Sequence, residues 1–97
     1  MQRIIVNINS NGKGFFALEN RYETVGHIEV EREGNELRII DTVVLLDRYL
    51  PLLGKLLLQG IVKYARMREL KIVTLSKFVQ QHFSSDPASY ADVWEKA

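Results

Sequence analysis

The fold is decided at Leu37–Leu75, which reads LRIIDTVVLLDRYLPLLGKLLLQGIVKYARMRELKIVTL. The pattern predicts a strand at Leu37–Leu45, a connection at Leu46–Pro51, a helix at Leu52–Glu69 and a second strand at Lys71–Leu75. A strand, a helix and a strand within about 40 residues form a βαβ unit, whose strands run parallel with a right-handed crossover. Such a unit brings a helix N-terminus to the carboxyl end of the first strand, where anionic ligands tend to bind.

The residues before this unit are predicted to form an antiparallel meander. The third strand alternates, with Gly26, Ile28 and Val30 on one face, as in a half-buried antiparallel strand. The last strand is nearly continuous in apolar residues, which predicts that both of its faces are covered. The four strands are expected at Arg3–Ile8, Gly14–Leu18, Thr24–Arg32 and Glu36–Leu45, with turns at Asn9–Gly14, Glu19–Glu23 and Gly34–Asn35.

The residues after the βαβ unit are predicted to be helical. Ser76–Phe83 has the spacing of an amphipathic helix, and the tail at Ala88–Ala97 offers Tyr90, Val93 and Trp94 as anchors against the core. The predicted class is α+β (mixed α/β), an antiparallel meander leading into a βαβ unit. At 97 residues, 46% of them hydrophobic, residues 1–97 are expected to form a single domain.

Composition limits the classes of function. The formal net charge is +1, from 13 basic and 12 acidic side chains, so neither nucleic acid nor an anionic membrane is an expected partner. The absence of cysteine excludes disulfides, thiolate zinc sites and a cysteine nucleophile. The N-terminus leads directly into a strand without the apolar region of a signal peptide, so a soluble cytoplasmic protein is expected.

A set of residues recurs in a characteristic order and spacing along almost the whole chain. These residues are Phe16, Val25–Gly26, Asp41–Val44, Gly54, Leu57, Tyr64–Arg66, Leu70–Val73, Phe78, Phe83, Pro87 and Tyr90. Their joint order resembles the GNAT superfamily of acetyl-CoA-dependent N-acetyltransferases, in particular its small single-domain members, and Asp41–Val44 stands where that family has His-Thr-x-Val. The resemblance implies parallel strands that splay apart, followed by C-terminal helices.

The resemblance also implies a binding site for acetyl-CoA. The backbone around Val44 would pair with the pantetheine arm, and the N–H groups of Leu53, Gly54 and Lys55 would face the pyrophosphate. Lys55 would add a positive charge. Free N–H groups and the helix dipole favour an anion at such a position.

The corresponding loop differs from the family pattern, which is Arg/Gln-x-x-Gly-x-Gly/Ala. In Tyr49–Gly54 only Gly54 matches, because Leu52 replaces the first glycine and Tyr49 replaces the basic or amide residue. Pro51 removes one N–H donor. Leucine side chains at positions 50 and 52 would crowd a diphosphate or cover it with apolar surface.

Two residues are candidates for catalysis. Asp41 lies in an otherwise apolar strand, so its carboxylate has a hydrogen-bonding partner such as an arginine, faces a cleft or lies at a splay in the sheet. A desolvated Asp41 would have a raised pKa and would act as a general base for an amine. Ser76 stands where the family often has cysteine, but its hydroxyl is a weak nucleophile without an adjacent base. The alternative role for Ser76 is to cap the following helix.

Other polar residues have structural alternatives. Gly54 permits either phosphate contact or close helix packing, and Lys55 shares a polar helix stripe that ordinary solvation explains. His27 alternates with glutamates on a solvent-type face. His82 and Asp86 are spaced four apart on a helix, but two ligands do not make a metal site, so no metal is expected.

Two functions follow from the sequence. The first is transfer of an acetyl group from acetyl-CoA to a primary amine of a small molecule or a protein, by direct attack of the amine. The alternative is a non-catalytic binding module that keeps the fold and has lost affinity for the coenzyme. In that case the leucines at 50, 52 and 53 would form an apolar patch for a partner or for a second copy, giving a homodimer.

Overall fold

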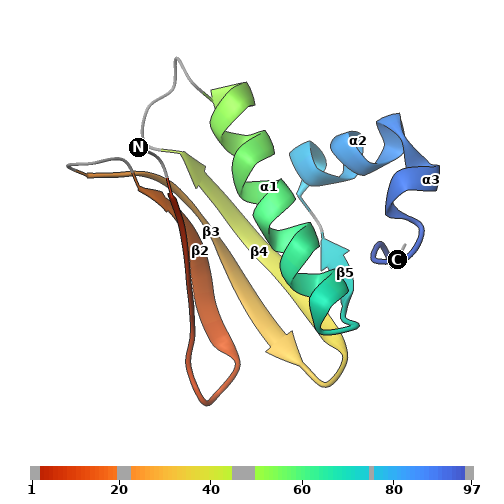
Figure 1. Ribbon diagram of the computed structural model, residues 1–97, viewed down its shortest axis with the longest axis horizontal. Coiled ribbons are helices and arrows are strands. Elements are labelled where there is room, and N and C mark those ends of the chain that lie inside the picture. Colours follow the sequence, from red (N-terminus) through yellow and green to blue (C-terminus); the bar gives the residue numbers. More distant parts are fainter. Residues whose placement is uncertain (1–2, 20–22, 45–49, 75, 96–97) are drawn as a thin grey trace.

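A computed structural model describes residues 3–19, 23–44, 50–74 and 76–95 of the chain. Its sheet has the order β1-β2-β3-β4-β5, antiparallel from β1 to β4 and parallel between β4 and β5. Figure 1 shows α1 crossing one face of this sheet, with α2 and α3 grouped on the side of β5. The elements are β1 (Arg3–Ile8), β2 (Lys13–Glu19), β3 (Thr24–Glu33), β4 (Glu36–Val44), α1 (Leu50–Met67), β5 (Lys71–Thr74), α2 (Lys77–Ser85) and α3 (Pro87–Tyr90).

The meander turns use the residues that the sequence singled out. The Oδ1 atom of Asn9 accepts hydrogen bonds from the N–H groups of Asn11 and Lys13 at 2.9 and 3.1 Å, which closes the β1–β2 turn. Gly12 and Gly34 have φ angles of +86° and +59°, a region that glycine adopts without a steric penalty. Both turns therefore lie where they were predicted.

The core lies between α1 and the face of the sheet that α1 covers. β2 contributes Phe16 and Leu18 to this core, and Tyr64 of α1 meets Phe16 edge to face at 5.2 Å. Burying each large apolar side chain contributes about 1.5–3 kcal/mol. The core side chains that solvent does not reach include Phe16, Leu18, Ile28, Val30, Leu37, Leu57, Leu58, Ile61, Ile72, Val79 and Phe83.

A β-bulge interrupts β4 at Ile40. In the β3–β4 register, Glu29 pairs with Asp41, but the next residue, Val30, pairs with Ile39. Ile40 is therefore an extra residue in β4. Its side chain is 55% exposed. The prediction that both faces of this strand are covered is wrong at Ile40, because the apolar run reflects an inserted residue at this position.

β4 and β5 part after a short parallel pairing. The register runs from Glu36↔Lys71 to Ile39↔Thr74 and stops there, although β4 continues to Val44. Figure 1 shows the two strands diverging, with the start of α1 above the opening. The predicted meander, βαβ unit and splayed parallel strands are confirmed.

α1 starts and ends two residues earlier than the predicted range Leu52–Glu69. At its C-terminus, the Leu70 N–H donates to the Ala65 carbonyl at 2.8 Å and the Glu69 N–H donates to the Arg66 carbonyl at 3.3 Å. This is a Schellman motif, whose left-handed residue is Glu69 with φ +57°. Because that position is usually glycine, the sequence carried no signal for the end of the helix.

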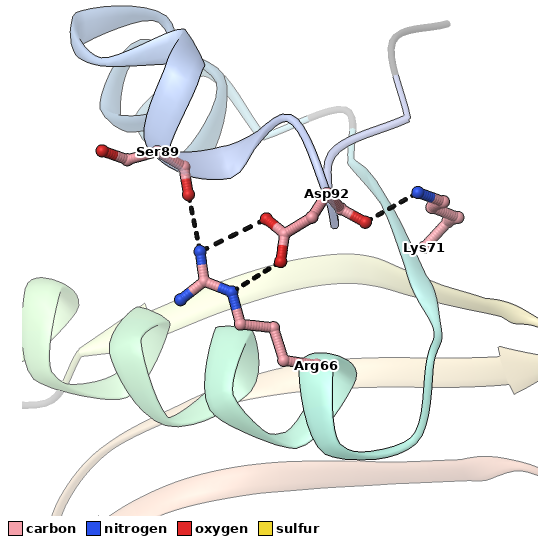
Figure 2. Close-up of polar contacts among 4 residues, drawn as sticks. All are labelled: Arg66, Lys71, Ser89 and Asp92. Atoms are coloured by element: carbon pink, nitrogen blue, oxygen red, sulfur yellow. Dashed lines mark hydrogen bonds and ion pairs between the residues drawn. The ribbon is translucent and has the colours of Figure 1, made fainter.

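The C-terminal tail is held to α1 by polar contacts (Figure 2). Arg66 donates from Nε and Nη2 to the two carboxylate oxygens of Asp92, at 2.8 and 3.3 Å. Its Nη2 also donates to the Ser89 carbonyl at 2.5 Å, and Lys71 Nζ donates to the Asp92 carbonyl at 2.6 Å. One guanidinium and one ammonium group therefore fix the tail in place.

Backbone and apolar contacts complete this docking. The Ile72 N–H donates to the Val93 carbonyl at 2.5 Å, and the Glu95 N–H donates to the Ile72 carbonyl at 2.9 Å, which covers the outer edge of β5. Val93 is buried, and the rings of Tyr90 and Trp94 lie 4.7 and 5.4 Å from that of Phe83. The three predicted anchors of the tail are confirmed. None of the helices in the described residues is long and apolar enough to span a bilayer.

Candidate functional site

The candidate site lies where β4 and β5 part. Among the described residues, no strand pairs with Ile40–Val44 of β4 on the side of β5. The backbone N–H and C=O groups on that side are therefore available to an extended ligand, in the way that an exposed sheet edge accepts a further strand. Val44, a predicted cofactor-binding residue, is the last residue of β4 and pairs with Gly26 of β3.

The start of α1 forms a second part of this region. Its first turn contains no acidic residue, so the positive end of the helix dipole is not offset there. In an α-helix that begins at Leu50, the N–H groups without an intrahelical partner belong to the first turn, and Pro51 has none. The amides of Gly54 and Lys55 fall in the second turn, where they are expected to donate within the helix. The binding role assigned to Leu53, Gly54 and Lys55 stays a prediction, and Leu45–Tyr49 lie outside the described residues.

Gly54 lies in a close helix contact. A methyl group at this position would come within 2.6 Å of Cζ and 2.9 Å of Cε2 of Phe78, the second residue of α2. The glycine therefore lets α2 pack closely against α1, which is the packing role that the sequence left open. The next residue, Lys55, is exposed. Burial of His82 on α2 lowers the pKa of that histidine, and the positive charge of Lys55 lowers it further.

Asp41 is placed by the sheet register directly opposite Glu29 of β3. It comes one residue after the bulge and therefore at the point where β4 has left β5. The side chain of Asp41 lies outside the described part of the structure. Its role as a general base stays a prediction.

Ser76 is the N-cap residue of α2. Its Oγ accepts a long hydrogen bond of 3.5 Å from the Val79 N–H, and its own N–H donates to Thr74 Oγ1 at 3.0 Å. Within the described residues, no hydrogen bond joins Ser76 to a histidine or a carboxylate. The geometry thus supports capping, and a catalytic role for Ser76 stays a prediction.

A hollow of about 740 Å³ lies on the face of the sheet opposite α1. It extends from β1 to the bulge residue Ile40, so it reaches the place where β4 and β5 part. Phe15 and His27 meet edge to face in its lining at 6.5 Å, and His27 Nε2 lies 4.0 Å from a carboxylate oxygen of Glu29. The half-exposed Glu29 side chain comes from the β3 residue that borders the bulge in the register.

The described residues give no support to a metal site. No group of three or more His, Cys, Asp or Glu side chains within them is arranged to hold a metal ion. His82 forms a hydrogen bond of 2.8 Å with the Tyr90 hydroxyl, which joins α2 to α3. Its spacing from Asp86 therefore has a structural explanation.

Comparison with solved structures identifies the architecture. The NMR solution structure of a "GCN5-like putative N-acetyltransferase" from Staphylococcus aureus superposes on the chain with a TM-score of 0.62 and 25% sequence identity. The match covers 96% of this chain and 89% of that one. The protein has a GNAT-superfamily fold. No family model and no curated protein matches its sequence.

Within this GNAT fold, two features were missed by sequence reasoning. The hollow was missed because Phe15, Ile40 and Glu29 belong to three strands, and no local pattern brings them together. The tail clamp was missed because Arg66 and Asp92 are 26 positions apart. The alternation in β3 that placed His27 and Glu29 on one face was the only available signal for the hollow.

Proposed function

We propose that this protein transfers an acetyl group from acetyl-CoA to a primary amine. The observation that carries the proposal is the parting of β4 from β5 after Ile39 and Thr74, which leaves the end of β4 open beside the start of α1. The similarity to an N-acetyltransferase of the same fold supports it.

The described residues fit the coenzyme at two points. The open side of Ile40–Val44 offers backbone donors and acceptors for the amide groups of a pantetheine arm. The first turn of α1 is free of acidic side chains, and the exposed Lys55 follows it, which favours a pyrophosphate. When bound, acetyl-CoA supplies the thioester whose carbonyl carbon accepts the amine.

The chain itself contributes orientation and polarity to the reaction. A backbone N–H of β4 beyond Ile39 would donate to an acyl oxygen and so stabilise the negative charge that develops there. Asp41, one residue after the bulge, is the proposed base that takes the proton of an ammonium group. Because this chemistry relies on positioning, the leucines at loop positions 50 and 52 weaken binding more than they affect the chemical step.

The acceptor amine is proposed to approach through the hollow on the open face of the sheet. Glu29 would attract the cationic amine, and the ring of Phe15 would contact its apolar part. The substitution Glu29→Gln is expected to raise the KM for the amine about fivefold. This factor corresponds to the loss of about 1 kcal/mol, the interaction energy of an exposed charge pair. Glu33→Gln is the matched control, since Glu33 pairs with Arg38 outside the hollow. Equal KM values for the two variants would contradict this route.

The binding experiment is an amide NMR titration with acetyl-CoA and with desulfo-coenzyme A. We expect saturable shifts at Val44, Leu53, Gly54 and Lys55. Lys55→Gln should weaken binding, whereas Lys63→Gln, two turns further along the same exposed stripe, should not. At about 1 mM ligand, complexes with a binding free energy of about 4 kcal/mol or more are detected. The absence of shifts at that concentration would refute the proposal.

Two variants test the predicted catalytic residues. Asp41→Asn should lower kcat with little change in the affinity for acetyl-CoA. Ser76→Ala should cost about 1 kcal/mol of stability if the serine acts as the helix cap. A fall in kcat for Ser76→Ala at unchanged stability would instead assign the serine a chemical role.

A further inference from the structure

The two edges of the sheet differ in how they are covered. The outer edge of β5 is closed by backbone hydrogen bonds between Ile72 and the tail residues Val93 and Glu95. The other edge is β1, which pairs only with β2 in the described residues. An uncovered strand presents a row of N–H and C=O groups to which another chain can pair.

The register shows which backbone groups of β1 face outward. The Asn9 N–H donates to the Lys13 carbonyl at 2.9 Å, and the same register continues through Asn7↔Phe15 and Ile5↔Ala17. In an antiparallel pair, residues that exchange hydrogen bonds alternate with residues whose groups point away. The residues that point their N–H and C=O groups away from β2 are therefore Ile4, Val6 and Ile8.

The side chains of these three residues are all apolar. Ile4 and Val6 are 37% and 42% exposed, and Ile8 packs partly against the core. Edge strands commonly carry lysine, proline or a bulge that prevents pairing with another chain. β1 has none of these, and its one charged residue, Arg3, is directed to Glu19 of β2 at 3.6 Å.

We propose that β1 is a dimerisation edge, at which a second copy of the chain adds its own β1 antiparallel. The two-fold axis would pass beside Val6, so that Val6 exchanges both hydrogen bonds with the partner's Val6. Ile4 then lies opposite the partner's Ile8. This register uses every outward backbone group of the three residues and places an apolar row along the seam.

The self-complementary pattern of β1 supports a second copy as the occupant, because its outward apolar residues, Ile4, Val6 and Ile8, are symmetric about Val6. In this register Arg3 lies opposite the partner's Asn9, and Ile5 lies opposite the partner's Asn7. No like charges face each other across the seam, which would destabilise a strand pair. The inference does not depend on acetyl transfer, because β1 is the strand farthest from the parting of β4 and β5.

The test is sedimentation equilibrium of the full chain over a concentration series. We expect a concentration-dependent dimer. Val6→Pro removes the outward N–H without removing a bond to β2, and Val6→Lys adds like charges at the two-fold axis; both should shift the protein to monomer. Met67→Lys is the matched control, since it places a lysine at an apolar residue of α1 that is 71% exposed. It should leave the dimer intact.

Amide hydrogen exchange of the unaltered chain gives a readout that does not depend on how a variant folds. The amides of Ile4, Val6 and Ile8 should become more protected as concentration rises, while those at the tip of the β1–β2 turn should not. A protein that stays monomeric up to about 1 mM, where even weak association is visible, would overturn the proposal. Dimers that persist in both Val6 variants, or that are lost in Met67→Lys, would also overturn it.

Discussion

Replacing Gly54 by alanine separates its packing role from a ligand-binding role. Alanine is favoured over glycine inside a helix by about 1 kcal/mol. The added methyl group would approach Cζ and Cε2 of Phe78 to 2.6 and 2.9 Å, so the partly buried ring must move. Such overpacking costs about 1–3 kcal/mol. We therefore expect Gly54→Ala to destabilise the protein by about 1 kcal/mol, with a fall in Tm of about 4–8 °C.

Urea denaturation followed by circular dichroism measures this change, and a double-mutant cycle assigns its cause. In a Phe78→Leu background the same substitution should become neutral or stabilising, because the smaller side chain leaves room. Gly60→Ala is the control, since the atom nearest to its methyl group is Cδ1 at the flexible end of Ile4, at 2.8 Å. The reasoning would be refuted if Gly54→Ala were as stable as the unaltered protein, or if its effect were independent of residue 78. A loss of acetyl-CoA shifts at unchanged stability would instead favour phosphate contact.

Three further predictions concern the tail, the end of α1 and His82 of α2. Arg66→Gln should lower the free energy of unfolding by about 1 kcal/mol at neutral pH, as expected for the loss of an exposed bidentate ion pair. Urea titrations at strongly acidic pH should show a smaller loss. The hydrogen bond from Arg66 lowers the pKa of Asp92 below 3.8. The stability that this ion pair contributes is therefore present above pH 3.8 and is lost as pH falls through the lowered pKa. Glu69→Gly should stabilise the protein by about 1 kcal/mol in the same assay, because it relieves the left-handed conformation of a non-glycine residue; equal or lower stability would contradict this. Burial lowers the pKa of His82 below 6.5, and the charge of Lys55 lowers it further, so the protein should lose stability as pH falls below 6.5. His82→Gln should make stability less dependent on pH in this range. In Lys55→Gln, an NMR titration should find the pKa of His82 raised.

Much of the fold could be predicted because its signals are local. The alternation around Ile28, the Gly34–Asn35 turn and the apolar residues of the βαβ unit each require only a few neighbouring positions. The anchors of the tail were predicted because large aromatic side chains near the end of a small chain rarely stay in solvent. The family resemblance gave the parting of β4 and β5, which no periodicity would have shown.

The site was harder to predict because it depends on register and on contacts across the chain. The role of Gly54 in packing becomes visible only when Phe78 of α2 is placed against it. The hollow requires residues of separate strands to share a face, and the register that brings Glu29 opposite Asp41 depends on the bulge. Tyr49, the first residue of the loop that the family pattern assigns to the coenzyme, lies outside the described residues.

The bulge at Ile40 also changes how this strand should be compared with related sequences. On one side of it the odd-numbered Leu37 and Ile39 share the core face, while on the other the even-numbered Thr42 is the residue paired with the buried Ile28. β4 therefore contains two alternation frames joined by one inserted residue. An alignment that leaves out this one-residue insertion would exchange the inward and outward residues of half the strand, Asp41 included. Deleting Ile40 would instead join the two frames, because Asp41 would follow Ile39 directly and stay opposite Glu29. The strand end that borders the proposed site would keep its phase with β3 and lose the bend that a bulge introduces.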